Sequence, residues 1–303
     1  MTFPFHELDR FRGVARDLSE LKRLYDQSTA DSVAERLFRR AWNDIAAGVK
    51  LEQVWPACVA DALIATQLAG IDADLLEQLG VHSAARSEIL SRSYEYAASA
   101  LSSDQLTAVR AVVAETRPRN SGVPSPRFVD ALIRQPRAGA TSPGKPRLTM
   151  QPAESHGDHC LVVAVLGALI ALHDGADPGR VFLAGLAHHL HNAALPDTGF
   201  AGEMMLGTSL EPIMTTLFSR ELATLSPAPE ALTTNALLLI ADADTPEGRV
   251  FHAADVIDRV LQAHHHARAS AFTADQALDD LELVHEGPLQ PFQKQVLAAM
   301  DLA

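Results

Sequence analysis

The chain has 303 residues, of which 47% are hydrophobic and 21% are charged, so the disordered and fibrous classes are excluded. Lys and Arg number 25 against 38 Asp and Glu, and the formal charge of −13 disfavours nucleic acid polymers and anionic membranes as partners. The first residues lack the pattern of a secretory signal, and no uncharged apolar stretch reaches the length of a membrane span. We therefore expect a cytoplasmic protein with a small-molecule substrate and no membrane partner.

The first part of the chain, residues 1–117, has helical rather than alternating hydrophobic periodicity. Aromatic residues make up only 5% of the chain, and strand signals are scarce throughout. The predicted helices are 31–48, 51–69, 73–80, 83–101 and 104–117, with Asp72 placed to cap the third of them. We interpret residues 1–117 as an N-terminal helical domain that either packs on the rest of the chain or forms a homodimer.

A segment rich in Pro and Gly follows at 118–153, which predicts a linker with one short helix at 126–135. Helical periodicity then resumes and predicts helices at 155–173, 178–192, 208–224, 228–241, 247–268, 273–283 and 288–301. Residues 154–303 are therefore expected to form a second helical domain, and the whole chain is predicted to be all-α. The two cysteines, Cys58 and Cys160, lie in apolar helical contexts that predict buried thiols.

Histidines cluster where the predicted helix 178–192 ends, in the run Ala187-His188-His189-Leu190-His191-Asn192. His159 lies on the preceding helix, while Asp255 and Asp258 share one face of the helix 247–268. Neutral imidazole and carboxylate together suit Fe, Mn, Co, Ni or Zn, and helix bundles place metal sites between facing helices. We predict one divalent metal ion, held by His159, His188, His189 and Asp255.

Three stretches that contain these ligands resemble a known family: Glu154-Ser155-His156-Gly157-Asp158-His159-Cys160-Leu161-Val162-Val163-Ala164, then Leu183-Ala184-Gly185-Leu186-Ala187-His188-His189, then Ala253-Ala254-Asp255. They resemble the HD-domain metal-dependent phosphohydrolases, nearest to the 5′-deoxynucleotidase-like branch, over about residues 155–270. The resemblance implies an HD-domain-like helical bundle, preceded here by the N-terminal block. It also implies that His159, His188, His189 and Asp255 are the metal ligands.

The chain departs from the pattern of that branch at three places. Its second paired residue is His189 rather than aspartate, Asn192 stands where the branch has glutamate, and Pro196-Asp197 stands where it has Gly-Asp. Because Asp197 keeps the aspartate, the resemblance makes it the candidate that orients or deprotonates a water molecule.

Two basic residues precede the first histidine. Lys145 and Arg147 resemble in position the basic residue that family members use near the substrate phosphate, so they are candidate substrate-binding residues; the alternative is that both are solvated loop charges. After the histidine run, the segment 197–205 is expected to form either a loop over the site, with Phe200 as an apolar lid, or a plain connection between helices.

The leading functional hypothesis is a metal-dependent hydrolase of a nucleotide or another small phosphate ester, in which the ion lowers the pKa of a bound water. One alternative is a mononuclear iron oxidase or lyase on the same fold, because histidine-rich iron sites with open positions activate oxygen. Another is a catalytically degenerate module, in which His189 records lost catalysis and the protein binds a ligand or a protein partner.

Overall fold

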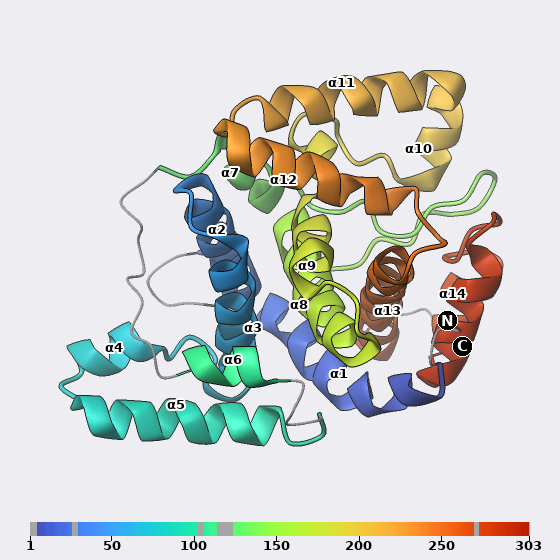
Figure 1. Ribbon diagram of the computed structural model, residues 1–303. Coiled ribbons are helices and arrows are strands. Elements are labelled where there is room, and N and C mark those ends of the chain that lie inside the picture. The colour runs from blue at the N-terminus through green and yellow to red at the C-terminus, as the bar shows by residue number, and fades with distance from the viewer. Residues whose placement is uncertain (1–4, 26–29, 102–105, 114–123, 270–272, 303) are drawn as a thin grey trace.

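The chain is described from a computed structural model, drawn in Figure 1. The structure describes residues 5–25, 30–101, 106–113, 124–269 and 273–302. These residues contain no strand and are 71% helical, so the prediction of an all-α helical bundle is confirmed.

The α-helices of the described residues are α1 (Arg12–Glu20), α2 (Val33–Ala46), α3 (Leu51–Leu68), α4 (Ala73–Gln78), α5 (Ser83–Ala97), α6 (Thr107–Val112), α7 (Arg127–Arg134), α8 (His156–Asp174), α9 (Pro178–Ala187), α10 (Gly199–Leu206), α11 (Leu210–Leu222), α12 (Pro227–Leu237), α13 (Pro246–Ala269) and α14 (Gln290–Ala299). The 3₁₀ turns are η1 (Phe5–Phe11), η2 (Leu21–Arg23), η3 (Leu190–Ala193), η4 (Gly207–Ser209) and η5 (Leu238–Ile240), and η6 (Gln276–Asp280) is a single π-helical turn.

Helices α8, α9 and α13 lie against one another in the middle of the molecule (Figure 1). Helix α8 is mostly apolar and is buried on every side, since residues 156–171 are all buried. A helix of this kind is stable only inside a core or a membrane. By length and composition α8 could cross a membrane, but 89% of its apolar window is buried inside the protein, as in the core helix of a folded domain.

Glycines allow these central helices to approach closely. A Cβ atom at Gly185 of α9 would lie 2.5 Å from the Cα atom of Ala164 in α8, which is closer than two such atoms can come. A Cβ atom at Gly167 would likewise lie 2.8 Å from a methyl group of Val181. The close packing brings the first turns of α8 to the last turn of α9, where the histidines lie.

The N-terminal helices pack on this centre: α2 and α3 contact α8, and α1 contacts α13. Buried residues from both parts of the chain belong to one hydrophobic core. Helices α2 and α8 each begin with a capping box, and the Ser32 hydroxyl of the first box donates to the Asp158 carboxylate of the second, at 2.5 Å. The N-terminal block therefore packs on the second part of the chain, as one of the two sequence predictions expected.

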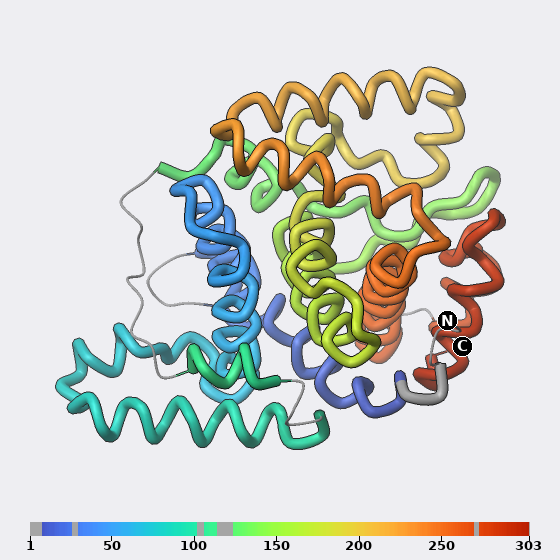
Figure 2. The backbone as a smooth tube through the Cα atoms, in the orientation of Figure 1, coloured from blue at the N-terminus to red at the C-terminus, as the bar shows by residue number. Residues whose placement is uncertain are grey.

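Helices α10, α11 and α12 form a layer across the end of α9, at the top of Figure 2. Helix α12 packs on α9, and α11 packs on η3, the turn that follows the paired histidines. At the right of Figure 2, α14 packs against η1, so the first and last described elements are neighbours. The layer over η3 is the part of the fold that encloses the histidine run.

The largest differences from the sequence predictions lie beside this run. The predicted helix 178–192 is wrong beyond Ala187, where α9 ends; His188 is its C-cap and His189 already has non-helical backbone angles. The segment 197–205 holds a helix, α10, rather than an open loop, because the Asp197 side chain accepts the N–H of Gly199 and starts it.

Other differences lie at the ends of the chain. No helix is predicted before residue 31, yet α1 forms there; its interior Gly13 and its lack of a capping side chain hide it from a sequence reading. The predicted helix 273–283 contains only the turn η6. Of the predicted helix 104–117, α6 covers Thr107–Val112, while residues 104, 105 and 114–117, like residues 118–123 of the predicted linker, lie outside the described residues.

Gly185→Ala should destabilise the fold, because the added methyl group meets the backbone of Ala164 rather than a flexible side chain. Overpacking of this kind costs about 1–3 kcal/mol, which denaturant unfolding would measure. Gly13→Ala is the matched control, since a Cβ atom there meets nothing within 4 Å and should leave stability equal or higher. Equal changes in stability for the two substitutions would contradict the inference that Gly185 is needed for the close approach of α8 and α9.

Candidate metal centre

The four predicted ligands come from three different elements. His159 lies in the first turns of α8, whose start is fixed by the Ser155–Asp158 capping box. His188 and His189 lie where α9 ends, and Asp255 lies on α13. The ligand nitrogens of the three histidines lie within 4.8 Å of one another. The structure thus brings together residues that are far apart in the sequence.

The hydrogen bonds of two of these rings fix which nitrogen is free. The Nδ1–H of His159 donates to the Oδ2 atom of Asp258, at 2.7 Å. The Nδ1–H of His188 donates to the backbone carbonyl of Gly185, at 2.8 Å. In a neutral imidazole the other nitrogen then carries a lone pair and no proton. The two Nε2 atoms face each other at 3.1 Å. When both rings are neutral, two acceptors meet there and a cation is needed between them.

His189 is oriented in the same manner by a side chain. Its Nδ1–H donates to the Oδ1 atom of Asn192, at 2.9 Å. The amide group of Asn192 in turn donates to the carbonyl of Leu195, which settles which end of the amide faces the histidine. The Nε2 atom of His189 is therefore the nitrogen that is free to bind a ligand. The end of α9 at Ala187 is what allows this local bond to form.

Asp255 adds a carboxylate to the same point. Its Oδ1 atom lies 3.2 Å from the Nε2 atom of His159, and its Oδ2 atom lies 3.5 Å from the Nε atom of Arg259. Burial alone would raise the pKa of Asp255, but Arg259 and His159 outweigh it and hold that pKa well below its usual value. Asp255 is therefore an ionised acceptor at neutral pH.

The histidines are held in the neutral form that binds metals. Burial, together with the neighbouring His159, lowers the pKa of His188 to about 3. Burial, together with His188 and the other nearby imidazoles, holds the pKa of His189 well below its ordinary value. Near pH 7 both rings are neutral, and a neutral imidazole offers a lone pair rather than a positive charge.

The donor set fits one divalent transition-metal ion. Two nitrogens at about 2.1 Å from the same ion lie about 3.0–3.4 Å apart at octahedral or tetrahedral angles. The 3.1 Å between the Nε2 atoms of His159 and His188 falls in this range. A nitrogen-rich set with one carboxylate suits Mn, Fe, Co, Ni or Zn. Cys160 is no competing thiolate, because burial raises the pKa of its thiol.

A cavity of about 300 Å³ opens beside these ligands and is lined by His188, His189 and Asp255. Two arginines, Arg137 and Arg259, also line it. Apolar and aromatic side chains cover another part of its wall; they are Phe200, Met214, Ile240, Phe251, Leu281 and Leu283. The cavity can thus accommodate a ligand with an anionic group near the ion and an apolar part away from it.

Phe200 belongs to this wall, so α10 contributes a side chain to the cavity. Its ring is stacked on that of His285, with centroids 3.9 Å apart and planes inclined by 16°. The expectation that Phe200 lies over the site agrees with this placement, although the residue is carried by a helix and not by an open loop.

The other predicted site residues are placed differently. Asp197 lines the cavity, and its two oxygens accept the backbone N–H groups of Ala138 and Gly199. Lys145 and Arg147 are not among the residues that line the cavity. Arg147 donates instead to the carbonyls of Ala138 and Thr198, which joins two loops. Their proposed contact with a substrate stays a prediction.

Sequence reasoning missed both arginines of the cavity. Arg259 lies four positions after Asp255 on α13, so helical spacing could have found it. Arg137 could not be found in this way, because it lies in the irregular segment between α7 and α8 and reaches the site through an ion pair with Glu154, at 3.0 Å.

Comparison with protein-family models, with curated proteins and with solved structures found no match to this chain.

The purified protein should contain one divalent transition-metal ion per chain when it is isolated without a histidine tag. His188→Ala should lose this metal on dialysis, because it removes one of three converging imidazoles. His82→Asn is the control, since His82 caps α5 and Asn can accept the same backbone N–H. Elemental analysis of the three proteins measures this. Equal metal content in all three would contradict the ligand assignment.

The metal-free protein should lose stability as the pH falls from about 6.5 to 4. Burial lowers the pKa of His156 and of His191 to about 4, so the unfolded chain takes up protons in this interval before the folded chain does. In His191→Gln the fall should be shallower, by up to about one proton in the slope against pH. Chemical unfolding at several pH values, with a chelator present, measures the free energy of unfolding. The same slope against pH in the wild type and in His191→Gln would contradict the statement that burial lowers the pKa of His191.

Proposed function

We propose that this protein is a metal-dependent hydrolase of a nucleotide or another small phosphate ester. The observation that carries the proposal is the convergence of three imidazole rings and an ionised carboxylate beside one cavity. Imidazole nitrogens and a carboxylate are ligands that a divalent cation can bind together, and a buried cluster of this kind is typical of a functional site. The proposal agrees with the resemblance of residues 155–270 to HD-domain phosphohydrolases.

The charges of the cavity support a phosphorylated substrate. Arg137 and Arg259 are the basic side chains of its lining, and a guanidinium group can bind phosphate through two parallel hydrogen bonds. The Nε atom of Arg259 is buried without a hydrogen-bond partner among the described residues. That atom lies 3.5 Å from Oδ2 of Asp255, and the charge of Arg259 keeps Asp255 ionised while its side chain lines the cavity.

His159, His188, His189 and Asp255 would hold the ion. Bound there, a divalent ion would polarise a phosphoryl oxygen and acidify a water molecule. The chain's own part is to orient the imidazoles through Asp258, Gly185 and Asn192, and to bind the phosphate with the two arginines. Asp197, which lines the cavity, is the candidate that orients the attacking water or accepts its proton.

A second candidate function is binding without catalysis. Both oxygens of Asp197 accept backbone N–H groups, and its pKa is lowered: burial opposes the shift, while these bonds and Arg137 outweigh burial. A carboxylate held in this way is a weak base. With His189 in place of an aspartate, these contacts favour a module that holds a metal and a phosphorylated ligand without hydrolysing it.

A screen of metal-loaded protein against nucleotides and small phosphate esters separates the two functions. If the protein is a hydrolase, phosphate is released, and Asp197→Asn lowers kcat by about 10²–10⁴-fold. Glu203→Gln is the matched control, because Glu203 is an exposed carboxylate on the lining of the same cavity, and it should change kcat little. Tight binding of a nucleotide with no phosphate release would favour the binding module.

A further inference from the structure

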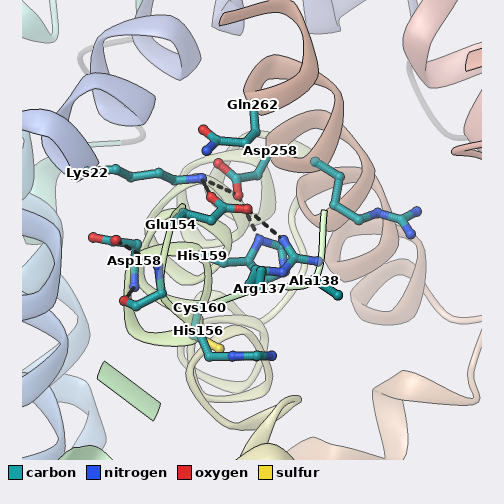
Figure 3. A network of polar contacts seen from close by, with 12 residues as sticks. Lys22, Arg137, Ala138, Glu154, His156, Asp158, His159, Cys160, Asp258 and Gln262 are labelled. Carbon is teal, nitrogen blue, oxygen red and sulfur yellow. Dashed lines mark hydrogen bonds and ion pairs between the residues drawn. The ribbon is translucent and has the colours of Figure 1, made fainter. Parts of the chain in front are cut away.

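A lysine of the N-terminal block lies buried beside the metal centre, as Figure 3 shows. The Nζ atom of Lys22 lies 2.6 Å from Glu154 and 2.7 Å from Asp258, and its side chain is 1% exposed. Lysine is almost never buried to this extent without partners. Burial alone would lower its pKa, but Asp258 and Glu154 outweigh burial and raise it, so the ammonium group is charged.

Lys22 meets the metal centre through a single carboxylate oxygen. The Oδ2 atom of Asp258 accepts from Lys22 and also from the Nδ1–H of His159. The side chain of Asp258 is fully buried, and its other oxygen has no hydrogen-bond partner among the described residues. Lys22 is therefore the cation that balances the carboxylate by which His159 is oriented (Figure 3).

The position of Lys22 is itself fixed by further contacts. Lys22 belongs to η2, which follows α1, and α1 packs on α13. The next residue, Arg23, donates to the side chain of Gln262, one helical turn beyond Asp258 on α13. Arg137 pairs with the other face of Glu154, so two cations and two carboxylates balance one another in the core. The ammonium group of Lys22 is therefore shielded from water, and it is bound by Glu154 and Asp258.

We propose that Lys22 is a positioning residue of the metal centre, and that the N-terminal block completes the site by holding Asp258 against His159. The inference rests on the metal site of the proposed function and not on hydrolysis. Carboxylates that accept from the second nitrogen of a ligating histidine fix its ring and tautomer, and their loss typically weakens metal affinity by about 10–100-fold. Without the ammonium group, Asp258 would be buried with its charge unbalanced.

The test is a Co²⁺ titration of the metal-free full-length protein, followed by the visible absorption of the bound ion. Lys22→Met removes the charge and keeps most of the side-chain length. It should weaken Co²⁺ binding by about 10–100-fold and alter the spectrum. Arg36→Met is the control, because it removes a partly buried cation of the same N-terminal block, paired with Asp72 at 2.7 Å and outside the site. It should leave both affinity and spectrum unchanged.

Lys22→Arg keeps the positive charge and should retain more of the affinity than Lys22→Met. Wild-type affinity and spectrum in a folded Lys22→Met protein would overturn the proposal, and so would equal losses in Lys22→Met and Arg36→Met. If Lys22→Met does not fold, Asp258→Asn is measured in its place. The same weakening is expected there, and unchanged Co²⁺ binding would overturn the proposal. If the protein binds Co²⁺ but releases no phosphate, the result contradicts the hydrolase function and leaves the role of Lys22 in metal binding unaffected.

Discussion

The site depends on one close contact, the approach of the Nε2 atoms of His159 and His188 to 3.1 Å. Each ring is held in place by a donor bond from its other nitrogen, to Asp258 and to the carbonyl of Gly185. Neither ring can turn away without losing a buried hydrogen bond. A metal ion bound to both Nε2 atoms would fit this distance, and this is why we interpret the site as a metal centre.

The fold supplies the constraint that keeps this contact in place. Gly185 lets α9 approach the backbone of α8, and the same residue provides the carbonyl that orients His188. The capping box at Ser155 fixes the start of α8. Lys22 then extends the hydrogen-bonded chain from His159 through Asp258 into the N-terminal block. The contacts between the N-terminal block and the second part of the chain therefore also help to hold His159 in place.

The sequence predicts the all-α class and most central helices, because long apolar segments with helical periodicity, such as 51–69 and 155–173, form buried helices. It also predicts that His159, His188 and His189 lie together, which the structure bears out. It does not predict the end of α9 at Ala187, beyond which the bond from His189 to Asn192 forms. Lys22 and Arg137 reach the site only through tertiary ion pairs, which leave no periodic signal.

X-ray absorption spectroscopy of the metal-loaded protein tests the central claim most directly. The account predicts nitrogen and oxygen neighbours at about 2.0–2.2 Å and the multiple scattering of about three imidazole rings. A sulfur neighbour at about 2.3 Å, or the scattering of fewer than two imidazoles, would contradict the site formed by His159, His188 and His189.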